Sequence, residues 1–166
     1  MKILRLSLLC FIVLVFSLSC KAVTGLLTGN EETIISQQTD ETLPIPQPGG
    51  LITRVTLALG SEPETYNPVN PATEFLPTDT IHAIVAVKKA PADTLFSARW
   101  VTTRVDLEDR DNTVINTTEI QTGGSGNLDF TLTPDGEFPT GSYRVEIYVN
   151  NKLDQLKTYK IVASGR

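Results

Sequence analysis

The chain has 166 residues, with 14 Lys and Arg against 19 Asp and Glu, which gives a formal net charge of −5. This acidic balance argues against a nucleic-acid partner and against electrostatic docking on anionic lipid. The chain has one histidine, His82, and two cysteines, Cys10 and Cys20. A zinc site or a catalytic triad needs more such residues, so we expect no cofactor, no metal and no enzymatic activity.

Residues 1–19 have the charge and length pattern of an export signal. Lys2 and Arg5 precede an apolar run from Leu6 to Leu18, which is shorter than the roughly 20 apolar residues that span a bilayer. The small residue Ser19 and then Cys20 close this run. The segment resembles the signal of bacterial lipoproteins, and the resemblance implies cleavage before Cys20 and attachment of lipid to that cysteine.

Lipid on Cys20 predicts a location in the cell envelope, anchored to a membrane and facing outside the cytoplasm, because several acyl chains hold a protein stably. The choice between an inner membrane, an outer membrane and the surface of a cell with a single membrane stays open. Ordinary secretion after cleavage near Ser19 and an uncleaved anchor are the alternatives.

Residues 20–50 show no sustained periodicity. The stretch 31–42 is mostly polar, and Pro44, Pro46 and Pro48 then alternate with other residues before the Gly49-Gly50 pair. Alternating prolines favour an extended conformation, and paired glycines release the chain into a new element. We therefore predict a flexible, lipid-anchored linker over residues 20–50, about 30 Å long as a coil, which carries one domain formed by residues 51–166.

From Leu51 onward, apolar residues alternate with polar ones, which is typical of half-buried β-strands. In the first strand, Val55, Leu57 and Leu59 share the face that we expect to be buried. Seven strands are predicted in all: 51–59, 80–87, 96–105, 113–121, 128–132, 143–149 and 155–163. The nearly continuous apolar strand 80–87 is expected at the centre of a sheet.

The remaining segments suit edges, connections and turns. The polar, β-branched strand 113–121 is expected at an edge or facing solvent. The prolines of residues 60–78 predict a long connection, with Phe75 and Leu76 closing one end of the core. The glycine-rich run 123–126 predicts a turn.

Seven short alternating strands indicate an antiparallel sandwich, with a partly open barrel as the alternative. The single Trp100, the segment from Phe138 to Asn150 with its Pro-Thr-Gly-Ser-Tyr turn, and Tyr159 resemble the immunoglobulin-like or fibronectin-like domains of bacterial envelope lipoproteins. The resemblance covers residues 52–163 and implies an all-β, seven-stranded antiparallel immunoglobulin-like sandwich. It also implies an accessory or adhesive role, Trp100 in the core and a hydrogen bond from Tyr143 to backbone.

Two tyrosines are the candidate ligand-binding residues, because stacking on sugar rings needs exposed aromatic side chains. Tyr148 alternates with the apolar face of its strand and is expected to be the best exposed ring, and Tyr66 lies in the proline-rich connection. His82 is expected at a sheet surface. The acidic stretch from Asp106 to Asp111 predicts a solvated turn, although its carboxylates leave calcium binding open.

The sequence thus predicts a membrane-anchored, non-enzymatic envelope lipoprotein whose immunoglobulin-like domain mediates protein interaction or adhesion. The expected partners are the membrane, through the lipid on Cys20, and an envelope or extracellular protein. The expected contact surfaces are the 60–78 connection and the 113–121 strand. A carbohydrate-binding module on the cell surface, with a glycan held by Tyr66 and Tyr148, is the alternative. The identity of the partner and the oligomeric state stay open.

Overall fold

The computed structural model describes residues 43–106 and 110–163. The predicted signal, Cys20 and most of the predicted linker lie outside these residues. The regular structure of the described residues is entirely β: β1 (Ile52–Ser61), β2 (Pro68–Pro71), β3 (Glu74–Phe75), β4 (Ile81–Val105), β5 (Val114–Leu132), β6 (Gly141–Val149) and β7 (Lys152–Ile161). None of the described residues forms a helix long and apolar enough to cross a membrane.

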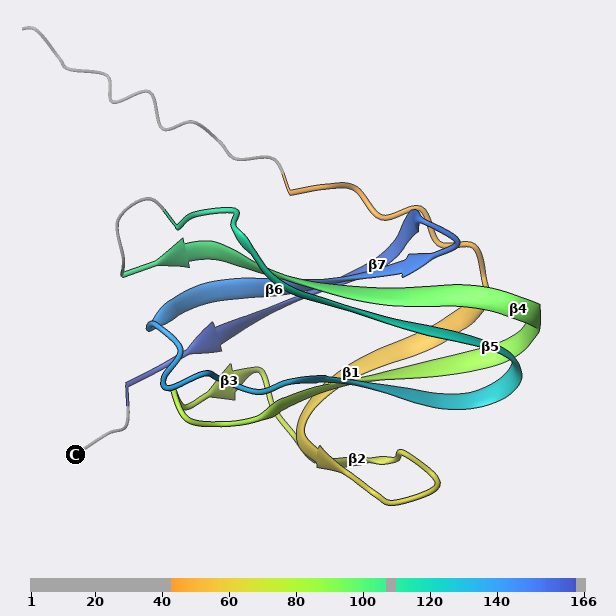
Figure 1. The fold of residues 1–166 in the computed structure, drawn as a ribbon, viewed down its shortest axis with the longest axis horizontal. Helices are drawn as coiled ribbons and strands as arrows, with labels where there is room; N and C mark the ends of the chain where they lie inside the picture. The colour runs from red at the N-terminus through yellow and green to blue at the C-terminus, as the bar shows by residue number, and fades with distance from the viewer. Residues whose placement is uncertain (1–42, 107–109, 164–166) are drawn as a thin grey trace, which may run out of the picture. The chain divides into compact units, whose positions relative to one another are not determined.

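The strands form one curled sheet in the order β2-β1-β4-β6-β7-β3, and β5 pairs with β4 outside this path (Figure 1). The predicted all-β class is therefore confirmed. The prediction of a purely antiparallel arrangement is wrong, because β3 runs parallel to β7, with Glu74 beside Lys160 and Phe75 beside Ile161. The proline-rich connection contains two short strands, β2 and β3, because a few residues can pair at a sheet edge despite prolines.

Two long strands replace four of the predicted short ones. β4 has 25 residues and β5 has 19, and the two pair antiparallel from Ile81 beside Leu132 to Val101 beside Val114. Irregularities in the pairing, between Val87 and Thr94, bend both strands together. Figure 1 shows this ribbon folding back at one end of the domain. Each half of β4 thereby lies in a different layer, beside β1 in one and beside β6 in the other.

The glycine-rich run 123–126 lies inside β5 and is not a turn between strands, so the predicted turn is wrong. A Cβ atom on Gly123 would lie 2.8 Å from Cα of Ala92 and 2.9 Å from the carbonyl oxygen of Pro91. Only glycine therefore lets the two backbones approach so closely at the bend. These glycines allow the β4–β5 pair to bend. In the sequence alone, the same residues have the pattern of a turn between two strands.

The core lies between the two layers and contains the side chains that the alternation predicts. Ile81, Ala83 and Val85 are fully buried, and their segment lies between β1 and β5, so the predicted central strand is confirmed. Trp100 is also fully buried, as the resemblance implies. Phe75 closes the core with 1% of its surface exposed.

Two predicted core residues are exposed instead. Leu59 is 43% exposed, because the β1–β4 pairing ends at Ala58 beside His82 and leaves Leu59 without a β4 neighbour. Leu76 is 38% exposed, because it follows the two-residue strand β3 and leaves the sheet. β1 thus extends past the core at Leu59, and Leu76 lies beyond the end of β3.

Tyr143 at the start of β6 anchors the chain that leads into the strand. Its hydroxyl donates to the carbonyl oxygen of Pro139 at 2.6 Å, so the predicted hydrogen bond to backbone is confirmed. Its ring stacks on that of Tyr159 with centroids 5.4 Å apart, and Tyr159 also meets Trp100 edge-on at 6.0 Å. Gly141 lets the start of β6 approach β4 closely, since a Cβ there would collide with the backbone carbonyl of Arg104.

The Tyr143 environment predicts a loss of stability at alkaline pH. Burial raises the pKa of Tyr143 to about 12 from 10.0, with Asp106 adding to the shift and Arg110 opposing it. The neutral phenol stabilises the fold below about pH 10, and this contribution is lost as the pH rises toward about 12. Tyr143→Phe should cost about 1 kcal/mol at neutral pH, through the lost hydrogen bond, and should weaken the alkaline dependence of the melting temperature.

Burial also raises the pKa of Tyr159, so part of the alkaline dependence should remain in Tyr143→Phe. An alkaline transition that is identical in the variant and the unchanged protein would contradict the assignment to Tyr143. Thermal unfolding followed by circular dichroism between neutral pH and about pH 11 makes the comparison.

The last residues of the predicted linker contact the domain. The backbone N–H of Gln47 donates to the carbonyl oxygen of Leu153 at 2.9 Å. The N–H of Gly49 donates to Oδ2 of the buried Asp154 at 2.5 Å. These two bonds hold residues 47–49 beside the start of β7.

Candidate functional site

The outward face of the β4–β6–β7 layer carries a cluster of charged and polar side chains that hydrogen-bond one another. On β6, Tyr143, Val145 and Ile147 point into the core, so Arg144, Glu146 and Tyr148 point outward. The β4 residue opposite Glu146 is Arg99, which therefore shares this face. The sequence places these residues on the solvent side, but the structure buries Glu146 completely.

Three side chains cover and neutralise Glu146. Nε of Arg99 and Nε of Arg144 each donate to its carboxylate at 2.7 Å, and the Tyr148 hydroxyl donates at 2.8 Å. Burial raises the pKa of this carboxyl, but the three hydrogen bonds and the charge of Arg99 outweigh burial and hold the pKa below its usual value. The three donors thus favour the ionised carboxylate, which suits a structural tie between β4 and β6.

The same cluster reaches the β4–β5 connection. Nη1 of Arg144 donates to Oδ1 of Asn112 at 2.6 Å. The guanidinium of Arg99 lies over the Tyr148 ring, 5.0 Å from its centroid, and is 40% exposed. Arg99 is therefore the partly exposed cation of this cluster.

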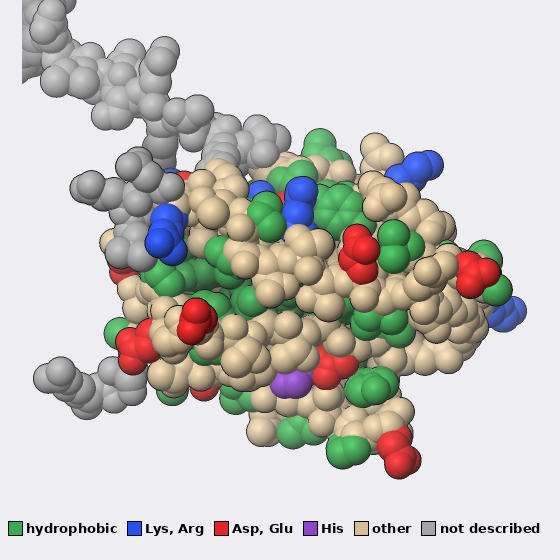
Figure 2. Space-filling view, viewed as in Figure 1, with side chains coloured by type: hydrophobic (Ala, Val, Ile, Leu, Met, Phe, Trp, Pro, Cys, Tyr) green, Lys and Arg blue, Asp and Glu red, His purple; other side chains and the backbone are tan. Residues whose placement is uncertain are grey.

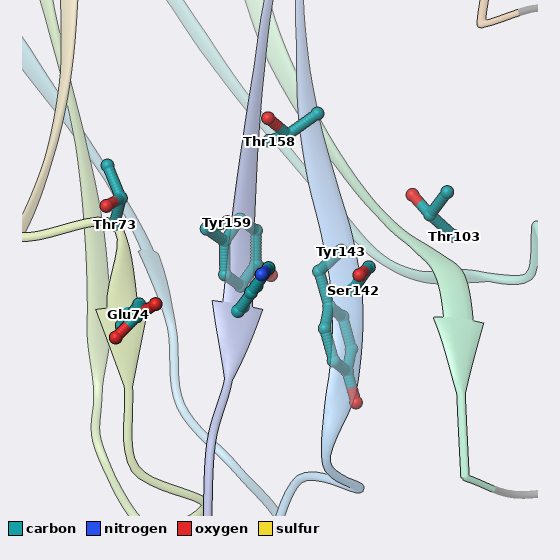
Figure 3. Close-up of a pocket in the computed structure, with 8 residues that line it drawn as sticks. Thr73, Glu74, Thr103, Ser142, Tyr143, Thr158 and Tyr159 are labelled. Atoms are coloured by element: carbon teal, nitrogen blue, oxygen red, sulfur yellow. The ribbon is translucent and has the colours of Figure 1, made fainter.

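Beside this cluster lies an open trough of about 460 Å³ on the same layer (Figure 3). Its lining residues are Thr73, Glu74, Thr103, Ser142, Tyr143, Thr158, Tyr159 and Lys160. Figure 3 shows short hydroxyl side chains along it, from β4, β6 and β7. Such a surface can hydrogen-bond a polar ligand, and its lining has no histidine or cysteine that could activate a nucleophile.

The two candidate ligand-binding tyrosines lie on elements that are not neighbours. Tyr66 is 44% exposed in the turn between β1 and β2. Tyr148 is only partly exposed on β6, and Arg99 covers one face of its ring. The expected ranking is therefore reversed, because the sequence could not show that Arg99 would cover Tyr148. The strand order separates β6 from β1 and β2 by β4, so the structure does not bring the two rings together.

His82 lies at a sheet surface, as expected, within a polar cluster that joins three strands. Its Nδ1 lies 2.9 Å from Oδ2 of Asp129 on β5, and the hydroxyl of Ser61 on β1 donates to the same oxygen at 2.6 Å. Figure 2 shows the chain's single histidine as a small surface patch beside an acidic side chain. Ser61 bonds Asp129 and not His82, whereas the hydroxyl of Thr131 lies 3.5 Å from Nδ1 of His82.

Sequence reasoning missed Ser61 and Asp129. No local motif marks them, because the three residues are far apart in the chain and meet only through the register of β4 with its two neighbours. His82 faces Ala58 in β1 and Thr131 in β5. A correct strand pairing is the only signal that would have found the cluster.

The acidic stretch from Asp106 to Asp111 lies partly outside the described residues, since 107–109 are not among them. In the part that is described, Asp106 accepts a hydrogen bond from the Thr140 hydroxyl, and Asp111 accepts one from the backbone N–H of Val105 at 3.2 Å. The described residues contain no group of three or more His, Cys, Asp or Glu side chains that could hold a metal ion. Calcium binding by this loop stays an open prediction.

Exposed large apolar side chains concentrate on the two predicted contact surfaces. They are Leu43, Ile45, Leu59, Tyr66, Val69, Leu76, Val114 and Ile115. Five of these eight lie within 60–78 or 113–121. Val114 and Ile115, at the start of β5, are 48% and 36% exposed. Of these side chains, Val114 and Ile115 are adjacent in the chain, and Tyr66 and Val69 lie three residues apart.

Comparison with known proteins finds structural neighbours and no family. No family model matches the chain, and no curated protein is similar to it. The structure is similar to that of an immunoglobulin-like protein from Pseudomonas aeruginosa, with 15% sequence identity and a TM-score of 0.40. The similarity covers 68% of this chain and 94% of that one. At this distance the similarity carries no argument about what the chain binds.

Proposed function

We propose that this protein is a non-enzymatic envelope lipoprotein, held to a membrane by lipid on Cys20, whose domain binds another protein. The anchor rests on the signal pattern of residues 1–19 and on the small residue before Cys20. The linker then holds the domain away from the membrane surface, within reach of a neighbouring protein.

We further propose an immunoglobulin-like sandwich, on the basis of strand pairing. The first half of β4 pairs with β1 and with the end of β5, which matches strands A, B and E of that fold. The second half of β4 pairs with β6 and with the start of β5, and β6 pairs with β7, which matches C′, C, F and G. The bond from Tyr143 to backbone four residues upstream also fits a tyrosine corner.

The observation that carries the protein-binding role is the concentration of exposed apolar side chains on 60–78 and 113–121. Both surfaces are loops or edges supported by a rigid core, which is the usual setting for binding residues. The acidic charge of the chain favours a partner that is neutral or basic where it touches the domain.

Partner capture should fall when the apolar side chains of one surface are removed. In cells that carry the full-length protein, cross-linking followed by mass spectrometry identifies the partner. The double variant Tyr66→Ser, Val69→Ser should recover about tenfold less of it, because exposed anchors dominate interfaces. Leu43→Ser, Ile45→Ser is the matched control, since these two residues are exposed outside both surfaces. Equal recovery in the two double variants would contradict the assignment of this surface.

The anchor has its own test in the same cells. Intact-mass measurement should find a chain that begins at Cys20 and carries fatty acyl groups, and Cys20→Ser should appear in the soluble fraction. A mass that retains residues 1–19 without acyl groups would overturn the lipoprotein assignment and leave the protein-binding role to be judged separately.

Carbohydrate binding is the second candidate, and the hydroxyl-lined trough is the observation that favours it. Hydroxyl and charged side chains recognise sugars by hydrogen bonds, and Tyr66 offers an exposed ring elsewhere on the domain. Glycan-array binding that is lost in Thr158→Val would support the trough, and loss in Tyr66→Ala would support the ring. An array without signal would dismiss this function.

A further inference from the structure

In the part of the chain that the structure describes, one edge of β5 carries no paired strand. Among the described residues it pairs with β4 alone, whereas the strands at the two ends of the sheet order, β2 and β3, are short. β2 has four residues with Pro68 and Pro71 at its ends, and β3 has two residues. Short strands and prolines are the means by which proteins protect sheet edges, and β5, with 19 residues and no proline, lacks both.

The hydrogen bonds of β4 identify which groups of β5 are free. The N–H of Leu95 donates to Oδ1 of Asn150, and the carbonyl oxygen of Leu95 accepts the N–H of Asn150, so both backbone groups of Leu95 point toward the end of β6. Leu95 lies opposite Gln121. The backbone groups of an antiparallel strand alternate in direction, so those of Thr117, Glu119 and Gln121 point away from β4.

The free edge has a regular stretch of defined length. From Asn116 beside Trp100 to Thr122 beside Thr94, the β4–β5 register runs without a shift, and irregularities lie on both sides of it. The sequence of this stretch is Asn-Thr-Thr-Glu-Ile-Gln-Thr. It carries one charge, Glu119, and no lysine, so it lacks the charged protection that edge strands usually have.

We propose that this edge pairs antiparallel with the same edge of a second copy of the chain, with Thr118 at the two-fold axis. In this register Thr118 faces its own counterpart, and Thr117 faces Glu119 of the second copy. Threonine pairs across antiparallel strands are favourable, and like charges directly opposite are not. The two Glu119 side chains each face a threonine here, so the stretch is complementary to itself.

The membrane anchor makes such pairing effective. Cleavage before Cys20 removes Lys2 and Arg5, so each anchored copy has 12 basic against 19 acidic residues, a net charge of −7, which opposes association in free solution. Tethering raises the local concentration of copies, so a short edge contact suffices on a membrane. The inference deepens the proposed protein-binding role and rests on it, because it assigns the 113–121 surface to a second copy. The two still fail separately, because the exposed apolar side chains of 60–78 remain available to capture another protein.

A cysteine at the two-fold axis tests the pairing. Side chains directly opposite each other in a pair without backbone hydrogen bonds have Cβ atoms about 4.5–5.5 Å apart, close to disulfide range. Full-length Thr118→Cys in membranes, treated with copper phenanthroline, should give a disulfide-linked dimer on a non-reducing gel. Thr158→Cys, at an exposed position on β7, is the control and should give no more dimer than the unchanged protein, because Cys10 leaves with the signal and lipid occupies Cys20.

A proline at a free position completes the test. Glu119→Pro removes an N–H that points away from β4, so it should spare the β4–β5 ladder and reduce dimer in the Thr118→Cys protein about tenfold. A Thr118→Cys protein that gives no more dimer than Thr158→Cys overturns the inference, and retained partner capture in the same cells leaves the proposed function standing. Cross-linking of the introduced thiol to a different protein would also overturn it and assign the edge to that partner.

Discussion

Glu146→Ala should lower the free energy of unfolding by about 3–5 kcal/mol, the usual cost of breaking a buried ion pair from one side. The carboxylate is completely buried and accepts bonds from Arg99, Arg144 and Tyr148. Without it, Arg144 remains as a buried cation with 9% of its side chain exposed. Urea unfolding followed by intrinsic fluorescence measures the difference, and Trp100 is the chain's single tryptophan reporter.

The two arginines provide the matched comparison. Arg99 is 40% exposed and can return to water when its partner is lost, whereas Arg144 cannot. The double variant Glu146→Ala, Arg144→Ala should therefore recover more stability than Glu146→Ala, Arg99→Ala. Equal recovery, or a loss in Glu146→Ala below about 1 kcal/mol, the range of an exposed pair, would mean that the cluster is solvated.

Glu146 also predicts an acid-sensitive fold. Burial opposes ionisation, but the hydrogen bonds and the charge of Arg99 lower the pKa of this carboxyl in the folded state. Its contribution to stability is therefore present above the pKa of an exposed glutamate, 4.5, and is lost as the pH falls through the lowered value. A pH series of urea unfolding should show this loss, and Glu146→Gln should flatten it. If Glu146→Gln lost as much stability at acidic pH as the unchanged protein, the assignment to Glu146 would be contradicted.

The core could be predicted from sequence because it follows period two. Val85 and Phe130 are buried where the alternation places them, whereas the burial of Trp100 and the hydrogen bond from Tyr143 to backbone agree with the resemblance to immunoglobulin-like domains. The division into strands could not be predicted, since the β4–β5 ribbon bends without separating. Gly123 looks like a turn residue in one strand, and only the backbone of Ala92 in the paired strand reveals a close approach.

The candidate site could be predicted less well, because its parts depend on long side chains and on register. Alternation correctly sends Glu146 outward, but the stems of two arginines then bury it. The same arrangement covers one face of Tyr148, which the alternation alone leaves open. The Ser61–Asp129 bond spans two strand pairings and has no local signature. The strand pairing determines which polar groups meet. The alternation specifies only the face of the sheet on which each side chain lies.

Trp100→Ala should destabilise the domain by about 3–5 kcal/mol, as large-to-small changes of buried aromatics do. Its side chain is fully buried and meets Tyr159 edge-on at 6.0 Å, so truncation opens a cavity between the two layers. Trp100→Phe should cost less than about 1.5 kcal/mol, because the indole Nε1 has no hydrogen-bond partner among the described residues and phenylalanine removes that donor. Thermal unfolding by circular dichroism measures both variants.

Tyr66→Ala is the matched control for Trp100→Ala, since its ring is 44% exposed and its loss should change stability by less than about 0.5 kcal/mol. Similar losses in the two variants would mean that the β1–β2 turn is part of the folded core. Because a loss of several kcal/mol also lowers the amount of protein in cells, Trp100→Ala should reduce partner capture only in proportion to its abundance. Tyr66→Ser, Val69→Ser should instead reduce capture at unchanged abundance, which separates a folding residue from a contact residue.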